Sequence, residues 1–196
     1  VNNARLNPDG TPMADVVTVA VSPRTTNASY PTPFTHTANA VYSGTYTVTK
    51  AGTYTLTVSV GSATSIPKIS GSPASILVTP GPVDALTLQA TGSCLGVSCI
   101  AGTVSVLTVQ TRDRYGNLLA GSSGAGVITA VFSGAATVAS SPCVYTINGQ
   151  YACEYALGKV GNYTLTVALS GVSAARTYST TVTPGPISSA ACTLNG

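Results

Sequence analysis

Apolar and polar residues alternate along short stretches of this chain. In the segment NYTLTVAL (162–169), every second residue from Tyr163 to Leu169 is apolar, which is the period of a half-buried β-strand. Turn-forming pairs such as Asp9-Gly10 and Asn148-Gly149 separate these stretches. No stretch keeps a helical period. The pattern predicts an all-β chain of sandwiches with Greek-key connections.

The chain also repeats itself. The segment AGTYTLTV (51–58) recurs as VGNYTLTV (160–167), a shift of 109 residues, and TPGP at 79–82 recurs at 183–186, a shift of 104 residues. Because an immunoglobulin-like sandwich has about seven strands in about 100 residues, each repeat is expected to be one such sandwich. The two proline-containing segments are expected to be short linkers.

The match extends upstream of these segments. DGTPMA (9–14) aligns with YGNLLA (115–120), and VVTVAV (16–21) aligns with VITAVF (127–132). Both repeats are therefore expected to point equivalent side chains inward. The inward positions that agree are Val17, Val19 and Val21 with Ile128, Ala130 and Phe132.

The two repeats are cut out of phase. Val1 aligns near Leu107, so the first repeat lacks its first strand and most of its second, whereas the second repeat has a full opening. The last ten residues, ISSAACTLNG, align with VDALTLQATG (83–92). The expected parts are an incomplete domain at 1–82, a complete domain at 83–186, and the first strand of a following repeat or a donor strand at 187–196.

Two explanations fit this register. The chain is a piece of a longer tandem array, or its last segment is donated to the incomplete sandwich of the next chain. An incomplete sandwich exposes an apolar groove and unpaired backbone groups, which is costly in free energy unless the groove is filled. Cys192 aligns with Leu88 and is interpreted either as a buried thiol or as a covalent link between chains. The expected assembly strand contributes Ile187, Ala190, Cys192 and Leu194, the last three as plugs.

The composition of the chain limits the classes of partner that it is expected to bind. Charged residues make up only 7% of the sequence, against about 25% in typical soluble domains. The net charge of +3 is spread thinly, which argues against a nucleic-acid partner. No apolar run approaches the roughly 20 residues that cross a bilayer, so no membrane insertion is expected. The chain begins at Val1, and any export signal is expected to have been removed or to lie outside it.

Five cysteines suggest an oxidising compartment. Cys143 and Cys153 flank VYTINGQYA, and a turn at 147–149 would place them opposite one another, which favours a local disulfide. Cys94 and Cys99 are close enough to form a second ring, although the four could pair differently. Zinc is not expected, because the spacings are not Cys-x-x-Cys and the chain has one histidine.

Two sequons agree with an extracellular location. They are Asn27-Ala-Ser and Asn162-Tyr-Thr. Asn162 lies on the polar phase of its strand, so an N-linked glycan there is expected to point to solvent.

Several segments resemble the filamin-type immunoglobulin-like repeat: GTYTVTKAGTYTLTVSV (44–60), ISGSPASILVTPG (69–81), TVQTRDRYGNLLAG (108–121) and GQYACEYALGKVGNYTLTVAL (149–169). The resemblance implies a mechanical, interaction-mediating module, often in tandem, that binds by strand addition to a sheet edge. The second repeat departs from it in lacking Gly-Ser-Pro before its last strand, and its cysteines and sequon suit a secreted version. Actin binding is not implied.

No residue pattern predicts catalysis, a metal or a cofactor. His36 is the only histidine, which leaves no base for a nucleophile, and the carboxylates are scattered. In TRDRYGN, Asp113 and Asn117 are expected to make local hydrogen bonds to the backbone in a turn. Four tyrosines fall on the apolar phase and are expected in the core: Tyr46, Tyr54, Tyr151 and Tyr163.

Hydroxyl-rich, charge-poor strands suit a sandwich whose outer faces are covered by sugar or by neighbouring copies. The sequence therefore predicts a non-enzymatic structural subunit of an extracellular or cell-surface fibre, assembled head to tail by strand complementation and domain stacking. Its partners would be other copies of itself and covalent glycans. The alternative is a binding module, an adhesin or receptor ectodomain fragment, that engages a ligand through a sheet edge or loops.

Overall fold

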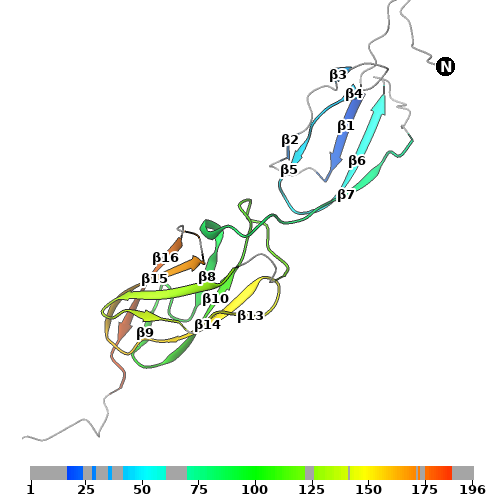
Figure 1. Ribbon diagram of the computed structural model, residues 1–196. Coiled ribbons are helices and arrows are strands. Elements are labelled where there is room, and N and C mark those ends of the chain that lie inside the picture. The colour runs from blue at the N-terminus through cyan, green and yellow to red at the C-terminus, as the bar shows by residue number, and fades with distance from the viewer. Residues whose placement is uncertain are drawn as a thin grey trace, which may run out of the picture. The chain divides into compact units, whose positions relative to one another are not determined.

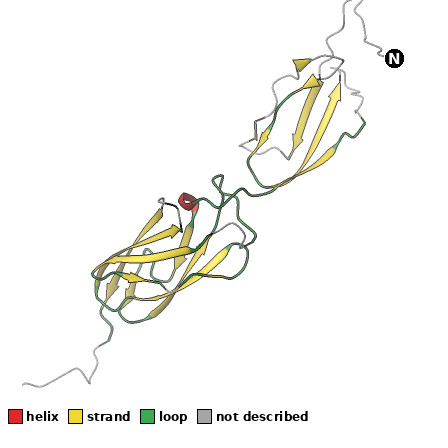
Figure 2. Cartoon of the chain, in the orientation of Figure 1, coloured by secondary structure: helices red, strands yellow, loops and turns green. Residues whose placement is uncertain are grey.

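A computed structural model of the chain has two compact units, Val1–Thr79 and Pro80–Gly196 (Figure 1). It describes residues 17–23, 28–29, 35–36, 42–60, 70–121, 126–140, 142–170, 172 and 175–186. The described residues are strands and loops apart from one 3-10 helix, η1 (Ala85–Thr87) (Figure 2). Five of the predicted site residues lie outside the described ranges: Asn27, Ile187, Ala190, Cys192 and Leu194.

Unit 2 has two sheets. The four-stranded sheet is antiparallel and runs in the order β13 (Val144–Tyr145), β14 (Gln150–Ala156), β10 (Val104–Gln110) and β8 (Gln89–Gly92). The five-stranded sheet runs in the order β12 (Val138–Ala139), β11 (Ile128–Gly134), β15 (Gly161–Leu169), β16 (Ala175–Thr183) and β9 (Ser98–Ile100). Its β16–β9 pair is parallel, and the others are antiparallel.

The core of unit 2 lies between these sheets. The alternating apolar residues of both sheets form one buried cluster, in which Phe132 of β11 stacks on Tyr155 of β14 with ring centroids 4.4 Å apart. Side chains with no exposed surface come from both sheets, so the two inner faces close on one another. These fully covered core residues are Leu107, Val109, Phe132, Cys153, Leu165 and Val167.

Unit 1 contains a three-stranded antiparallel sheet and two short strand pairs. The sheet runs in the order β1 (Val17–Ser22), β6 (Gly52–Val60) and β7 (Ala74–Val78). The short pairs are β2 (Ala28–Ser29) with β5 (Thr47–Val48), and β3 (Thr35–His36) with β4 (Tyr42–Ser43).

The strand register of unit 1 repeats that of unit 2. Val21 pairs with Leu56 in unit 1, as Phe132 pairs with Leu165 in unit 2. Further along, Gly52 pairs with Val78, as Gly161 pairs with Val182. Strands β1, β6 and β7 therefore correspond to β11, β15 and β16, which is the alignment that the apolar pattern predicted.

A tyrosine anchors the start of the equivalent strand in each unit. The Tyr54 hydroxyl donates a hydrogen bond to the Lys50 carbonyl at 2.8 Å, and the Tyr163 hydroxyl donates to the Lys159 carbonyl at 2.9 Å. A tyrosine that bonds back to the backbone a few residues upstream is the tyrosine corner of immunoglobulin-like sandwiches.

Tyr46 corrects one expectation. Three of the four predicted core tyrosines are buried, but Tyr46 is 41% exposed. Its counterpart in unit 2 is Tyr155, which is 5% exposed because β14 pairs with β10 and packs on the opposite sheet. The described part of unit 1 has no counterpart of β10 or β8, so the strands that flank Tyr155 are not matched beside Tyr46 there.

Candidate functional site

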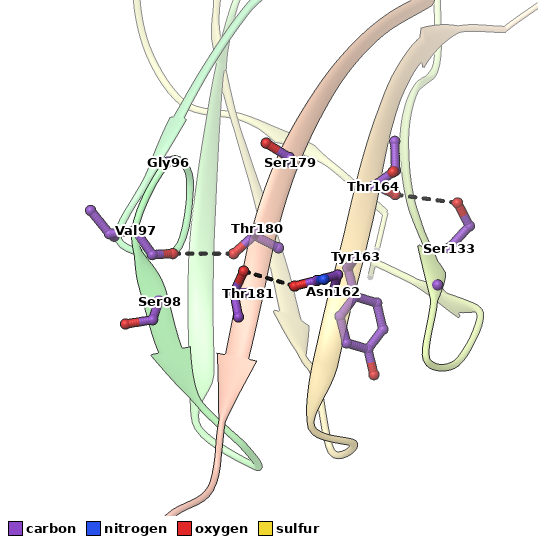
Figure 3. A pocket seen from close by; sticks show the side chains of 11 residues that line it. Gly96, Val97, Ser98, Ser133, Asn162, Tyr163, Thr164, Ser179, Thr180 and Thr181 are labelled. Carbon is purple, nitrogen blue, oxygen red and sulfur yellow. Dashed lines mark hydrogen bonds between the residues drawn. The ribbon is translucent and has the colours of Figure 1, made fainter.

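A shallow groove crosses the outer face of the five-stranded sheet of unit 2 (Figure 3). Its volume is about 550 Å³. It contains the sequon asparagine, Asn162. The lining comes from β9 and the turn before it, the end of β11, β15 and β16: Gly96, Val97, Ser98, Ser133, Gly134, Asn162, Tyr163, Thr164, Ser179, Thr180 and Thr181.

Strand register arranges the polar side chains of this groove in two rows. Ser133, Thr164 and Ser179 are paired across β11, β15 and β16. Asn162 pairs with Thr181, which in turn pairs with Ser98 of β9. Neighbours in a row lie about 4.8 Å apart because that is the spacing of paired strands. The strand side chains that face the groove are therefore hydroxyls and one amide, and the turn before β9 adds the apolar side chain of Val97, which is 57% exposed. None of the lining side chains is charged.

Asn162 lies on the exposed side of β15, between the buried positions of that strand. Its Oδ1 accepts a hydrogen bond of 3.0 Å from the Thr181 hydroxyl, and Figure 3 shows the amide directed toward β16. Among the described residues, no hydrogen bond engages Nδ2. The amide is thus oriented by its neighbour while its nitrogen stays available.

Gly134 allows β11 to end close to β15 at this groove. Its φ is 147°, and a Cβ there would lie 2.1 Å from the Asn162 carbonyl oxygen. Any larger residue would push the two strands apart, because a backbone atom cannot move aside as a side chain can.

A disulfide closes the hairpin on the other sheet. Cys143 and Cys153 are joined with Cα atoms 4.2 Å apart, and the β13–β14 register places them opposite one another. The turn between the strands has Asn148 and Gly149 at positive φ, 51° and 71°. A Cβ on Gly149 would lie 2.1 Å from the Leu119 carbonyl oxygen, so this turn requires glycine.

Cys94 and Cys99 differ from expectation, since both thiols are free in the structure. They contact one another, and the Cys94 sulfur also lies 3.4 Å from the Ser105 hydroxyl. Burial acts to raise the pKa of Cys94, but hydrogen bonds from Cys99 and Ser105 outweigh it, and the net pKa is lowered. Burial and contact with Cys94 raise the pKa of Cys99 to about 11. The pair therefore favours a thiolate at Cys94 and a protonated thiol at Cys99.

The turn TRDRYGN is organised by the Asp113 carboxylate, which is 1% exposed. It accepts hydrogen bonds from the Gly81 amide at 2.9 Å, the Tyr115 and Asn117 amides at 2.9 Å, and the Asn117 side-chain amide at 2.8 Å. Burial acts to raise the pKa of Asp113, but these donors outweigh it and hold the pKa below its ordinary value. The expected local role of Asp113 is thus met, and its bond to Gly81 adds a long-range one.

The predicted site residues do not gather in one place. Asn162 lies on the outer face of the five-stranded sheet, whereas the disulfide belongs to the four-stranded sheet. Within the described ranges, no cluster of histidine, cysteine or carboxylate side chains could hold a metal ion. The same part of the chain contains no helix that is long and apolar enough to span a membrane. Periodicity located Asn162, but the row of hydroxyls around it depends on pairings that the sequence alone does not give.

No protein-family model matches the chain, and no curated protein matches it. Similar solved structures include FdeC, an Escherichia coli adhesin, at 19% identity over 90% of this chain and 56% of that chain, with a TM-score of 0.47. The Lin-41 filamin domain is 22% identical over 54% of this chain and 100% of its own length, with a TM-score of 0.42. Invasin, a bacterial integrin-binding protein, is 20% identical over 91% of this chain and 35% of its own length, with a TM-score of 0.48.

These likenesses concern the fold alone, because the identities are below 25% and the TM-scores below 0.5. The chain also spans only 56% and 35% of the adhesin and invasin structures. The assignment of the fold depends instead on strand order, register and the tyrosine corners. By these features unit 2 is an immunoglobulin-like β-sandwich, and unit 1 repeats part of it.

Proposed function

We propose that this chain is a non-enzymatic structural segment of an extracellular or cell-surface fibre. Copies assemble head to tail, with the last strand of one chain completing unit 1 of the next, and the sandwiches stack along the fibre. The supporting observation is the inner face of unit 1, which is less covered than the same face of unit 2.

Tyr46 carries this observation. It is 41% exposed, whereas Tyr155, its counterpart, is 5% exposed. A tyrosine ring is a large apolar surface, and covering it stabilises a sandwich by about 1.5 to 3 kcal/mol. Unit 1 therefore gains stability from any strand that covers this ring.

The neighbouring strand supports the same proposal. Leu56 and Val58 of β6 are only half-buried, whereas Leu165 and Val167, their counterparts in β15, have no exposed surface. Within the described residues, β6 is thus less enclosed by packing partners than β15 is.

The edge of β7 is also open within the described residues. In unit 2, the equivalent edge of β16 is closed by the parallel strand β9, which pairs with Thr181–Thr183. On β7, no described strand pairs beyond β6, and Leu77 is 71% exposed. Open edges of this kind accept strands from other chains. A strand added here would take the place of β9, whereas the donor 187–196 aligns with β8, which pairs with β10 in the other sheet.

Unit 2 indicates which residues of the donor would point inward. The donor Ile187–Gly196 aligns with 83–92, where Leu88 is fully buried, Ala90 is 8% exposed and Leu86 is 57% exposed in η1. By this equivalence Cys192 and Leu194 fill the acceptor core, and Ala190 points outward. The sequence pattern alone expected all three as plugs.

Assembly can be tested by sedimentation and negative-stain microscopy of the full chain. Deletion of 187–196 should abolish assembly, and so should Leu194→Asp, because an ionised carboxylate in an apolar core costs several kcal/mol. Ala190→Asp is the matched control, and its assembly should match the wild type. Continued polymerisation without 187–196 rejects the donor. A wild-type chain that stays monomeric favours the binding module instead.

A further inference from the structure

We propose that Asn162 carries an N-linked oligosaccharide whose first sugars lie in the hydroxyl-lined groove, against the outer face of the five-stranded sheet. This inference rests on the extracellular location in the proposed function, but not on strand donation. It differs from the expectation of a glycan directed into solvent.

The acceptor geometry supports modification at Asn162. The side chains of Asn162 and Thr164 lie on the same exposed face of β15, separated by the buried Tyr163. The hydroxyl residue that the sequon needs is therefore next to the asparagine on that face. Oδ1 is held by Thr181, while Nδ2 has no hydrogen bond among the described residues.

The covalent step requires a donor of a defined class, a lipid-carried glycosyl diphosphate. The bond from the anomeric carbon to the diphosphate oxygen breaks, and a bond from that carbon to Nδ2 forms. Nδ2 loses one proton to water, and the diphosphate leaves with the bonding electrons. No electron is gained or lost overall, so no oxidant or reductant is needed.

The side chains of the groove have hydrogen-bonding chemistry that suits a sugar. Its exposed side chains from four strands are hydroxyls and one amide, which both donate and accept hydrogen bonds as sugar hydroxyls do. Val97, in the turn before β9, adds an exposed apolar surface on which the apolar C–H face of a sugar ring can pack. It contains no charged side chain that would have to be desolvated. The rows run from Asn162 toward Ser98 on one side, and from Thr164 toward Ser133 and Ser179 on both sides.

The shallowness of the groove does not argue against bound sugar, because the glycan would be attached beside it. A free saccharide would bind weakly to an open groove of about 550 Å³ that has no exposed aromatic platform, since Tyr163 is 2% exposed. A glycan attached at Asn162 has a millimolar or higher effective concentration at the groove, so weak contacts are enough. Such a glycan would also cover polar surface on a chain that is only 7% charged.

The first measurement is mass spectrometry of the native protein. Trypsin cuts after Lys159 and Arg176, so Asn162 falls on the peptide 160–176. This peptide should carry a hexosamine-containing mass that Asn162→Gln and Thr164→Val abolish. Thr164→Ser keeps the sequon and should retain the mass. An unmodified 160–176 peptide in the secreted wild type overturns the proposal.

The second measurement is the rate at which a peptide amidase releases the glycan from the folded protein. This rate reports whether the groove shields the first sugars. Seated sugars should shield the linkage, and Ser133→Ala/Ser179→Ala should speed release about three- to tenfold through lost hydrogen bonds. Thr129→Ala, on the same face of β11 but outside the groove, is the matched control and should leave the rate unchanged. Equal rates in all three proteins would place the glycan in solvent. Assembly of Asn162→Gln separates the two proposals, because strand donation to unit 1 does not use this face.

Discussion

Asp113 shows how much one side chain contributes. Its folded-state pKa lies below the unfolded value of about 3.9, so the ionised carboxylate stabilises unit 2 fully above that pH. This stabilisation is lost as the pH falls through the folded pKa. Asp113→Asn should therefore lower the unfolding free energy of unit 2 by about 1 to 3 kcal/mol at pH 7.

Urea denaturation at pH 7 and at pH 3 measures this effect. The difference between wild type and Asp113→Asn should shrink at the lower pH, since the wild-type carboxyl becomes neutral too. Asp84→Asn is the control, because the Asp84 carboxylate accepts a single hydrogen bond, from the Leu86 backbone amide. A difference between wild type and Asp113→Asn that is the same at both pH values would contradict the assignment.

The thiols of Cys94 and Cys99 should close a disulfide when an oxidant is supplied. With oxidised glutathione, the Cys94 thiolate attacks the reagent and releases one glutathione, and the Cys99 thiolate then displaces the second. Thiol counts in denatured protein should fall by two, and Ser105→Ala should shift the pH dependence of the rate upward. In Cys99→Ser the reaction should stop at the mixed disulfide. Persistence of both thiols under excess oxidant would refute the pairing.

Residue-scale roles were only partly predictable from sequence. The turn roles of Asn117 and Gly149 could be predicted from the sequence, because such residues act through their own backbone. The hydrogen bond from the Gly81 amide to the Asp113 carboxylate spans 32 residues, and no local sequence pattern predicts it. The exposure of Tyr46 was missed for a similar reason, since the alternating pattern gives its phase but not what lies above it.

At the scale of strands, the tyrosine corners make a matched pair of tests. Tyr163→Phe and Tyr54→Phe each remove one hydroxyl that bonds a lysine carbonyl four residues upstream. Each should lower the unfolding free energy of its own unit by about 0.5 to 1.5 kcal/mol. Hydrogen exchange resolved by unit is the measurement. A loss of protection in the wrong unit would show that the corners are not local.

The disulfide of the β13–β14 hairpin should stabilise unit 2 through the unfolded state. Its cysteines are 10 residues apart, and closing a loop of that size contributes about 2 to 3 kcal/mol in the chain-entropy model. The double variant Cys143→Ala/Cys153→Ala should lose at least this much in chemical denaturation. Reduced wild type, which keeps both side chains, is the comparison that removes the cavity effect at Cys153. An unchanged stability after reduction would contradict the expectation.

Strand register was the most predictable feature at this scale. The alternation of apolar residues fixed which faces of β1, β6, β11 and β15 point inward, because a slip of one residue would expose the whole set. The sequence did not predict the pairing of β9 with β16, in which Cys99 lies opposite Val182 and the Thr183 hydroxyl donates to the Cys99 carbonyl across 84 positions. It also read 85–87 as strand, whereas Asp84 caps a 3-10 turn there.

For the whole molecule, the two units should behave differently when separated. A fragment of 80–186 contains a complete core and should be a folded monomer. A fragment of 1–79 should gain hydrogen-exchange protection when a peptide of 187–196 is added, because that peptide would cover the inner face around Tyr46. A scrambled peptide is the control. Protection of 1–79 that is already complete without peptide would count against the acceptor.

The parallel pairing of β9 with β16 has a mechanical consequence. β9 lies near the start of unit 2 and β16 at its end, so a pull on the two ends drags these strands past one another along their length. The bonds between them, such as Ala101 amide to Thr183 carbonyl at 2.9 Å, are then sheared together instead of being unzipped one at a time. The edge that closes the sheet is thus also one that resists tension along the chain by shear.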